Sequence, residues 1–153
     1  LIPSPRVETY DEKPEMSAFE LTKELENKIE TNKYNFILTN FANPDMVGHT
    51  GNLRATIKAI EVVDECLGRI YKKCIDHDYT LIVTSDHGNA DVMYNKDEAI
   101  KCTTHSINPV PFIICQNYRF LKNDGSLADI APTILKIMNI KTPEEMQGSC
   151  LIE

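Results

Sequence analysis

The chain has 153 residues, of which 42% are hydrophobic and 25% are charged. This composition is ordinary for a globular domain and far from the low apolar content of disordered chains. Sixteen Lys and Arg residues against twenty-three Asp and Glu residues leave a net charge of −7. That charge argues against nucleic acid or an anionic membrane as a partner. No apolar run approaches the roughly 18–20 residues that a membrane-spanning helix needs.

The start of the sequence and its cysteines bear on where the protein works. The chain begins at Leu1 without Met or an apolar leader, and we expect it to be a segment of a longer protein. Five cysteines without a Cys-x-x-Cys pair predict reduced thiols and a cytoplasmic protein. Cys102 and His105 form one Cys-x-x-His pair, which is a weak zinc signal because no second pair exists.

The first third of the chain predicts a helix and a strand. Ser17 and Glu20 have the spacing of a capping box, and the apolar residues after them predict a helix over 17–30. Residues 34–39 form a compact β-rich run that is typical of a buried strand. A loop rich in Asn, Asp, Gly and Pro follows it, over residues 40–51.

The rest of the chain continues this alternation. A broad apolar stripe predicts the longest helix over 53–77, and strands are predicted over 79–84 and 110–115. A last helix is predicted over 127–138, with Pro132 tolerated in its first turn. This order predicts an α/β fold around a mostly parallel sheet, in which ligand sites gather at the carboxyl ends of the strands.

Two candidate metal ligands lie in the loop after the first strand. Asp45 and His49 are spaced i, i+4, so on a helical turn both side chains project from one face. A carboxylate oxygen and an imidazole nitrogen together suit Mn or Zn. The alternative is that Asp45 caps a turn and His49 is an ordinary surface residue.

A second candidate pair follows the strand over 79–84. Asp86 and His87 stand where the backbone turns away from the strand, and Gly88 permits a tight turn or a close backbone approach. The alternative is an Asx turn with an incidental histidine. Ser85 is not expected to be a nucleophile, because no glycine-flanked elbow surrounds it and no acid orients the neighbouring histidine.

The remaining histidines carry less information individually. His105 lies in the loop ahead of the strand over 110–115, and His77 is expected at the solvated C-terminus of the longest helix. Five candidate ligands come from three loops: Asp45, His49, Asp86, His87 and His105. They exceed one tetrahedral site but do not complete two, which predicts two metals with further ligands from elsewhere. Paired metals serve phosphoryl chemistry.

Eight motifs in the chain resemble the cofactor-independent (2,3-bisphosphoglycerate-independent) phosphoglycerate mutases of the alkaline phosphatase superfamily. The motifs are LIPSP at 1–5, TYD at 9–11, PEMSA at 14–18, NFANPDMVGHTGN at 40–52, AIEVVDECLGR at 59–69, TSDHGNAD at 84–91, HSINPVPFI at 105–113 and LADIAPTIL at 127–135. They occur in the family's order from the first residue to the last, and NPDMVGHTG is distinctive of this group. The resemblance implies a three-layer α/β/α fold like that of alkaline phosphatase, incomplete in this chain.

The resemblance also implies roles for individual residues. Asp45, His49 and His105 resemble three ligands of one Mn²⁺, and Asp86 and His87 resemble two ligands of a second. The complete enzymes interconvert 3-phosphoglycerate and 2-phosphoglycerate, a step of glycolysis and gluconeogenesis, through a phosphoserine. The chain has no counterpart of their nucleophilic serine, catalytic lysine or substrate-binding middle domain, so no catalytic or cofactor-binding residue is assigned to it.

We therefore expect residues 1–153 to be the C-terminal portion of the metal-binding phosphatase-like domain. Alone it should be inactive and hold at most one partly formed metal site. Alternatives are a phosphopentomutase or metal-dependent phosphohydrolase of the same superfamily, or a non-enzymatic metal-binding domain. We expect the complete enzyme to be a monomer that acts on a small molecule, without nucleic-acid or membrane partners. The segment alone should self-associate through exposed strand edges.

Overall fold

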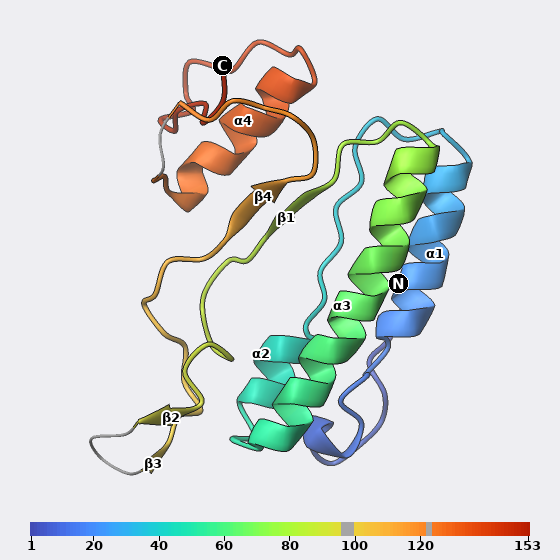
Figure 1. The fold of residues 1–153 in the computed structure, drawn as a ribbon, viewed down its shortest axis with the longest axis vertical. Helices are drawn as coiled ribbons and strands as arrows, with labels where there is room; N and C mark the ends of the chain where they lie inside the picture. Colours follow the sequence, from blue (N-terminus) through green and yellow to red (C-terminus); the bar gives the residue numbers. More distant parts are fainter. Residues whose placement is uncertain (96–99, 122–123) are drawn as a thin grey trace. The chain divides into compact units, whose positions relative to one another are not determined.

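A computed structural model describes residues 1–95, 100–121 and 124–153. The chain folds into two compact units, residues 1–115 and residues 116–153. Figure 1 shows the order of their elements along the chain. None of the helices in the described residues is long and apolar enough to cross a membrane.

Helices dominate the first unit. After the short 3₁₀ turn η1 (Tyr10–Glu12) come α1 (Ala18–Glu30), α2 (Asn43–Gly48) and α3 (Leu53–Asp76). In Figure 1, α1 and α3 lie side by side, and α2 packs near the start of α3. The helices predicted over 17–30 and 53–77 are thus confirmed to within one residue at each end.

Helix α3 is held by its apolar face and by its caps. The face turned toward the core carries small and medium side chains: Ala55, Ala59, Val62, Cys66, Ile70 and Cys74. The side chain of Asn52 caps the helix by accepting a hydrogen bond from the backbone N–H of Ala55 at 3.3 Å. His77 is the C-cap residue, where the sequence predicts it. Arg69 and Glu26 join α3 to α1 through two hydrogen bonds of 2.6 and 3.0 Å.

The capping box predicted at the start of α1 is wrong, although the helix itself forms. Ser17 is the N-cap residue, but its side chain makes no capping hydrogen bond. Its hydroxyl instead donates to the carbonyl oxygen of Pro3 at 2.7 Å. The entry segment competes for the same hydroxyl, and the contact ties that segment to the helix.

The strand predicted over residues 34–39 is not formed. The segment contains no strand, since none of the described residues pairs with it in a ladder. Ile37 and Phe41 pack against the cluster that α1 and α3 form, whereas Phe36 is 51% exposed and Leu38 is 84% exposed. The side chains therefore alternate as in a strand, but no strand among the described residues lies beside the backbone.

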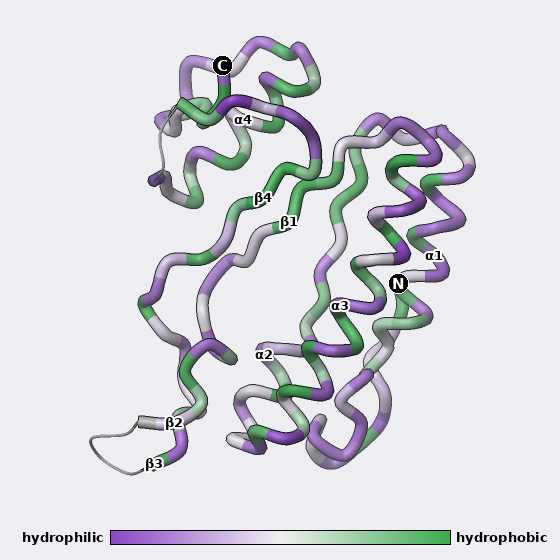
Figure 2. Tube along the Cα trace, in the orientation of Figure 1, coloured by the Kyte–Doolittle hydropathy of each residue, from purple (hydrophilic) through white to green (hydrophobic). Residues whose placement is uncertain are grey.

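The described strands form two antiparallel pairs. β1 (Ile82–Thr84) pairs with β4 (Phe112–Ile114), and β2 (Tyr94–Asn95) pairs with β3 (Ile100–Lys101). Figure 2 shows that β1 and β4 are mostly hydrophobic, as the sequence predicts for 79–84 and 110–115. The prediction of a mostly parallel sheet is not met by these strands. A parallel pair needs a crossover connection, and between β1 and β4 the described residues contain a hairpin and no helix.

The second unit is built around one short helix. η2 (Leu127–Asp129) leads directly into α4 (Ile130–Ile137), which confirms the helix predicted over 127–138. Pro132 lies in the first turn of α4, as predicted. The buried carboxylate of Asp129 accepts hydrogen bonds from the backbone N–H groups of Ser126 and Ser149, at 2.8 and 2.6 Å, and so fastens the following loop to the helix start.

Candidate metal centre

Helix α2 positions the first two candidate ligands. Pro44 lies in the first turn of α2, where a backbone N–H has no partner within the helix, so the missing N–H of proline costs no hydrogen bond. His49 is the C-cap residue of α2. The backbone N–H of His49 donates to the carbonyl oxygen of Asp45 at 3.0 Å, so the two residues are one helical turn apart. Their side chains share one face, as the i, i+4 spacing predicts, and Asp45 Oδ1 lies 3.2 Å from His49 Nε2.

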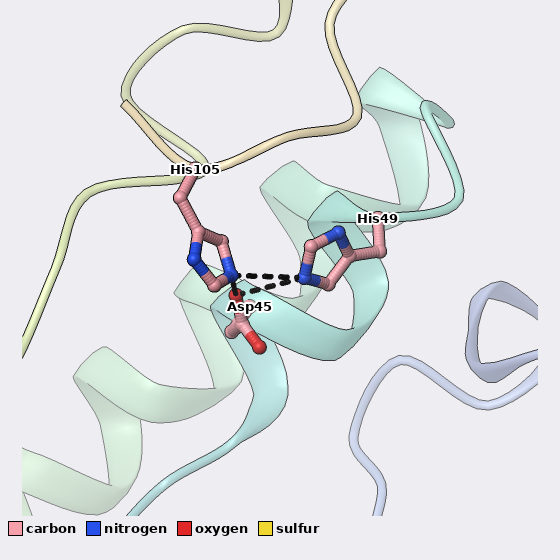
Figure 3. Close-up of side chains that lie close together, drawn as sticks. All are labelled: Asp45, His49 and His105. Atoms are coloured by element: carbon pink, nitrogen blue, oxygen red, sulfur yellow. Dashed lines mark hydrogen bonds and ion pairs between the residues drawn. The ribbon is translucent and has the colours of Figure 1, made fainter. Parts of the chain in front are cut away.

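His105 completes a group of three potential ligands. Its Nε2 lies 3.2 Å from Asp45 Oδ1 and 3.1 Å from His49 Nε2. Figure 3 shows both imidazole rings directed at the same carboxylate oxygen. Among the described residues, Asp45, His49 and His105 are the group of metal-ligating side chains whose ligand atoms lie close enough to share an ion.

The proton positions on His49 can be inferred from its contacts. Its Nδ1 lies 2.6 Å from the carbonyl oxygen of Thr103, which can only accept a hydrogen bond. Nδ1 therefore carries the proton, and in the neutral ring Nε2 presents a lone pair. Asp45 Oδ1 and His105 Nε2 lie 3.2 and 3.1 Å from that nitrogen, so a cation bound between the three atoms would be held by all of them.

The spacing of the three atoms fits a small divalent ion. They form a triangle with edges of 3.1, 3.2 and 3.2 Å. Tetrahedral ligands at about 2.1 Å from an ion are about 3.4 Å apart, and octahedral neighbours are about 3.0 Å apart. Two imidazoles and one carboxylate are also a donor set that first-row divalent metals accept. The residues present therefore fit a metal ion.

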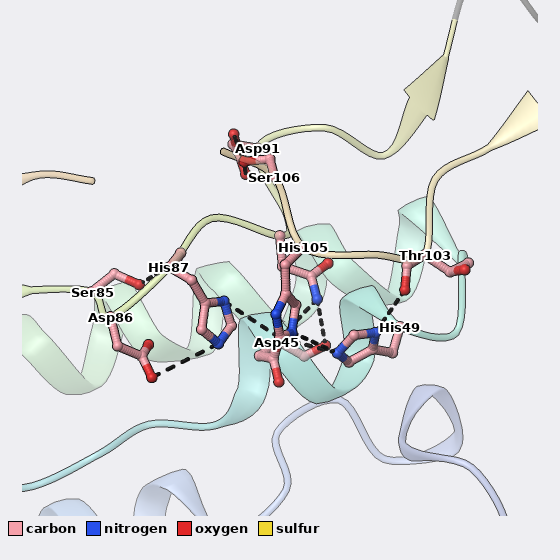
Figure 4. Close-up of polar contacts among 10 residues, drawn as sticks. Asp45, His49, Ser85, Asp86, His87, Asp91, Thr103, His105 and Ser106 are labelled. Carbon is pink, nitrogen blue, oxygen red and sulfur yellow. Dashed lines mark hydrogen bonds and ion pairs between the residues drawn. The ribbon is translucent and has the colours of Figure 1, made fainter. Parts of the chain in front are cut away.

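His87 lies against this group. Its ring stacks on that of His105, with centroids 3.7 Å apart and an interplanar angle of 19°. His87 Nδ1 lies 4.0 Å from Asp45 Oδ1, too far for a hydrogen bond, and is buried without a hydrogen-bond partner in the described residues. The Asp86 side chain is 76% exposed, and its Oδ2 lies 3.8 Å from His87 Nε2. Figure 4 shows His87 beside Asp45, His49 and His105, with Asp86 on the far side of His87; neither joins their ligand group among the described residues.

The serine next to these residues is turned to another task. Ser85 Oγ donates to the backbone carbonyl oxygen of His87 at 2.6 Å, which closes the turn after β1. That Ser85 is not a nucleophile stays a prediction. The described residues also leave Cys102 outside the ligand group of His105, so the weak zinc signal of that pair is not supported.

Sequence reasoning missed the residues that hold the ligands in place. Asn89 is buried, and its Nδ2 donates to Asp45 Oδ1 at 2.7 Å. The backbone carbonyl of Thr103 orients His49. Asn89 stands inside the motif TSDHGNAD, but a motif shows which residues recur and not which neighbour an amide contacts. Such supporting contacts fix the orientation of ligands and tune the metal.

The surroundings of the triad are open and acidic. A hollow of about 420 Å³ lies beside His49, and its lining includes the carboxylates of Glu8 and Asp11. A hydrogen bond from the Asn52 side chain, followed by one from Thr9, lowers the pKa of Asp11. The described lining holds no Lys or Arg.

Comparison with known proteins agrees with this arrangement. The sequence profile of the metalloenzyme superfamily matches residues 1–142. The chain belongs to the metalloenzyme superfamily. This membership supports the predicted fold class, since the matching structure described next shares the fold over nearly the whole chain.

The chain is similar to several proteins that are named phosphoglycerate mutases. A 2,3-bisphosphoglycerate-independent phosphoglycerate mutase of Antithamnion sp. is 56% identical over 156 residues, which cover 99% of this chain and 30% of the relative. One from Ehrlichia ruminantium (strain Gardel) is 52% identical and covers 100% of this chain and 31% of the relative. Crystal structures of Leishmania mexicana phosphoglycerate mutase at low cobalt concentration match with a TM-score of 0.87 and 32% identity, covering 99% of this chain and 31% of that one. The chain thus spans about a third of the length of its relatives.

Proposed function

We propose that the chain is the metal-binding portion of a cofactor-independent phosphoglycerate mutase that interconverts 3-phosphoglycerate and 2-phosphoglycerate. The observation that carries the proposal is the convergence of Asp45, His49 and His105 on one point. The relatives at 52–56% identity support it, because their match extends over nearly the whole chain and so includes the segments that carry these three residues. The Leishmania mexicana structure supports the same fold around the site.

Each proposed ligand has a defined task. Asp45, His49 and His105 hold one ion, and Asp86 and His87 contribute to a second, with Mn²⁺ as the ion we propose for both. Divalent ions offset the negative charge of a phosphoryl group and orient it for transfer. The net charge of this chain is −7, which repels an anionic substrate unless bound cations offset it.

The remaining parts of the reaction belong to the longer protein. We place the phosphoserine-forming residue and the residues that hold the glycerate in the two thirds of the relatives that this chain does not cover. We further propose that the enzyme is a cytoplasmic monomer of glycolysis and gluconeogenesis. The five free cysteines support a reducing compartment.

The test uses the protein at its full natural length. With Mn²⁺ it should convert 3-phosphoglycerate to 2-phosphoglycerate, and His49→Ala should lower this activity by more than about 100-fold, since a lost ligand costs more than a lost supporting contact. His77→Ala is the matched control, because His77 caps α3 and belongs to no ligand group in the described part of the chain. Isomerisation of pentose phosphates without glycerate activity, or full activity of His49→Ala, would overturn the proposal.

A further inference from the structure

Asp91 joins the two loops that carry His87 and His105, although it is not a candidate ligand. Its carboxylate accepts hydrogen bonds from Ser106 Oγ at 3.1 and 2.9 Å and from Asn108 Nδ2 at 2.6 Å. Figure 4 shows Asp91 and Ser106 in contact above the triad. The single Ser106 hydroxyl proton is shared between the two carboxylate oxygens, so two donors from one loop hold one side chain of the other.

The backbones of the two loops meet at the same place. Gly88 and Ser106 form an isolated antiparallel bridge, in which the Ser106 N–H donates to the Gly88 carbonyl oxygen at 2.8 Å. A Cβ atom on Gly88 would lie 2.3 Å from Ser106 Oγ and 2.8 Å from Asp91 Oδ1. A larger residue at position 88 would displace the Ser106 hydroxyl and the Asp91 carboxylate from each other, so Gly88 leaves room for their contact.

The contact between the two loops, which Gly88, Asp91, Ser106 and Asn108 make and which we call the joint, lies next to both histidines. Gly88 directly follows His87, and Ser106 directly follows His105. The two rings stack at 3.7 Å between centroids immediately beside the joint. A change in the joint moves the two imidazoles relative to each other, and these are the histidines that the proposed function divides between two ions.

The carboxylate of Asp91 is occupied by its donors and is not directed at the ions. The hydrogen bond from Asn108 is the largest cause that lowers the pKa of Asp91, and the one from Ser106 adds to it, while burial opposes them. The group is thus an ionised acceptor that holds two donors from one loop. Its oxygens do not belong to the group of converging ligand atoms among the described residues.

We propose that Asp91 is a positioning residue of the metal centre, which clamps the loop of His105 to the loop of His87 through Ser106 and Asn108 and so sets the spacing of the two metal sites. The inference rests on the proposed function for the presence of the ions. It adds a residue that neither the ligand set nor the comparisons assign.

The test measures metal binding rather than turnover. The full-length protein, stripped of metal, is titrated with Co²⁺, whose visible absorption reports the coordination of the ion. Asp91→Asn keeps the shape of the side chain but replaces one acceptor oxygen with an N–H₂ group, so we expect Co²⁺ affinity to fall about 10- to 100-fold with altered absorption bands. The double variant Asp91→Asn/Asn108→Asp exchanges donor and acceptor, and should bind within about threefold of the wild type.

Two controls separate positioning from general stability. Asp64→Asn makes the same chemical change on the exposed side of α3 and should leave the titration unchanged. Thermal midpoints of the metal-free variants are measured in parallel. The double variant Asp91→Asn/Asn108→Asp, called the swap variant, should restore both the Co²⁺ affinity and the Co²⁺ absorption spectrum. If Asp91→Asn does not fold, Ser106→Ala and Asn108→Ala each remove one donor and should each weaken Co²⁺ binding.

Two results would overturn the inference. One is a Co²⁺ affinity and spectrum of Asp91→Asn equal to those of the wild type, and the other is a swap variant as weak as the single variant. Both would leave the proposed function standing, because the wild type would still bind the ion. A wild-type protein that binds no Co²⁺ would instead overturn the proposed function, and this inference with it.

Discussion

Asn89 donates a hydrogen bond of 2.7 Å to Oδ1 of Asp45, the carboxylate oxygen that also lies 3.2 Å from both His49 and His105. Asn89 is buried, and its own Oδ1 is packed against Gly48 without a hydrogen-bond partner in the described residues. The orientation of the carboxylate therefore depends on an amide that has little freedom to move.

Gly48→Ala should weaken metal binding by displacing Asn89, which supports Asp45. A Cβ atom at this position would lie 2.6 Å from Asn89 Oδ1, so the amide must shift and its hydrogen bond to Asp45 must lengthen. We expect metal affinity to fall about tenfold, as for other supporting contacts. Gly68→Ala is the matched control, because nothing lies within 4 Å of its Cβ position in the middle of α3. Calorimetric titration with Mn²⁺ measures both variants, and equal affinities would contradict the prediction.

Ile70→Ala should destabilise the first unit strongly. Ile70 is 2% exposed and packs with Leu25 and Ile29 of α1 in one apolar cluster. Removing its side chain leaves a cavity, which costs about 2–5 kcal/mol in comparable cores. Ile75→Ala removes the same atoms from a position that is 60% exposed on the same helix, and should change stability by less than about 0.5 kcal/mol. Urea unfolding measures the stability of both variants. Equal losses of stability would contradict the prediction that the buried face of α3 contributes more than its exposed face.

The ion pair between Lys73 and Glu30 should make stability depend on pH. The hydrogen bond from Lys73, followed by its charge, lowers the pKa of Glu30, and the hydrogen bond from Glu30 raises the pKa of Lys73. The contribution of Glu30 is present above the ordinary glutamate pKa and is lost as the pH falls through the lowered value. Glu30→Gln should therefore be less stable than the wild type at pH 7 but not at acidic pH. Urea midpoints between pH 2 and pH 7 measure the difference, and a constant difference would refute it.

The sequence predicted the helices, and the shared face of Asp45 and His49, well because these signals are local. The apolar stripe of α3 lies within the helix itself, and the i, i+4 spacing of Asp45 and His49 defines a shared face once α2 forms. His105 carried no signal of its own, because its position is set by the contact of its loop with Gly88. The family resemblance supplied it where spacing could not.

The strands were harder to predict because their pairing is not local. The apolar run over 34–39 has strand periodicity, yet a strand exists only when another backbone supplies hydrogen bonds. β1 and β4 are apolar enough for a buried parallel sheet, but they pair antiparallel with each other. Composition gives the tendency to form strands, whereas partner and direction depend on segments distant in the chain.

The unpaired segment over 34–39 gives a last prediction, on the self-association of the 153-residue chain. Leu38 is 84% exposed and Phe36 is 51% exposed, while Ile37 between them packs on the core of α1 and α3. An extended segment without a neighbouring strand and with exposed apolar side chains is a template for pairing with another chain. Leu38→Lys should therefore reduce self-association in analytical ultracentrifugation without lowering stability. Ile37→Lys, one residue away, should instead destabilise the fold, because it places a charge against the apolar cluster. If Leu38→Lys associates as strongly as the wild type, the segment over 34–39 is not the surface through which the chains associate.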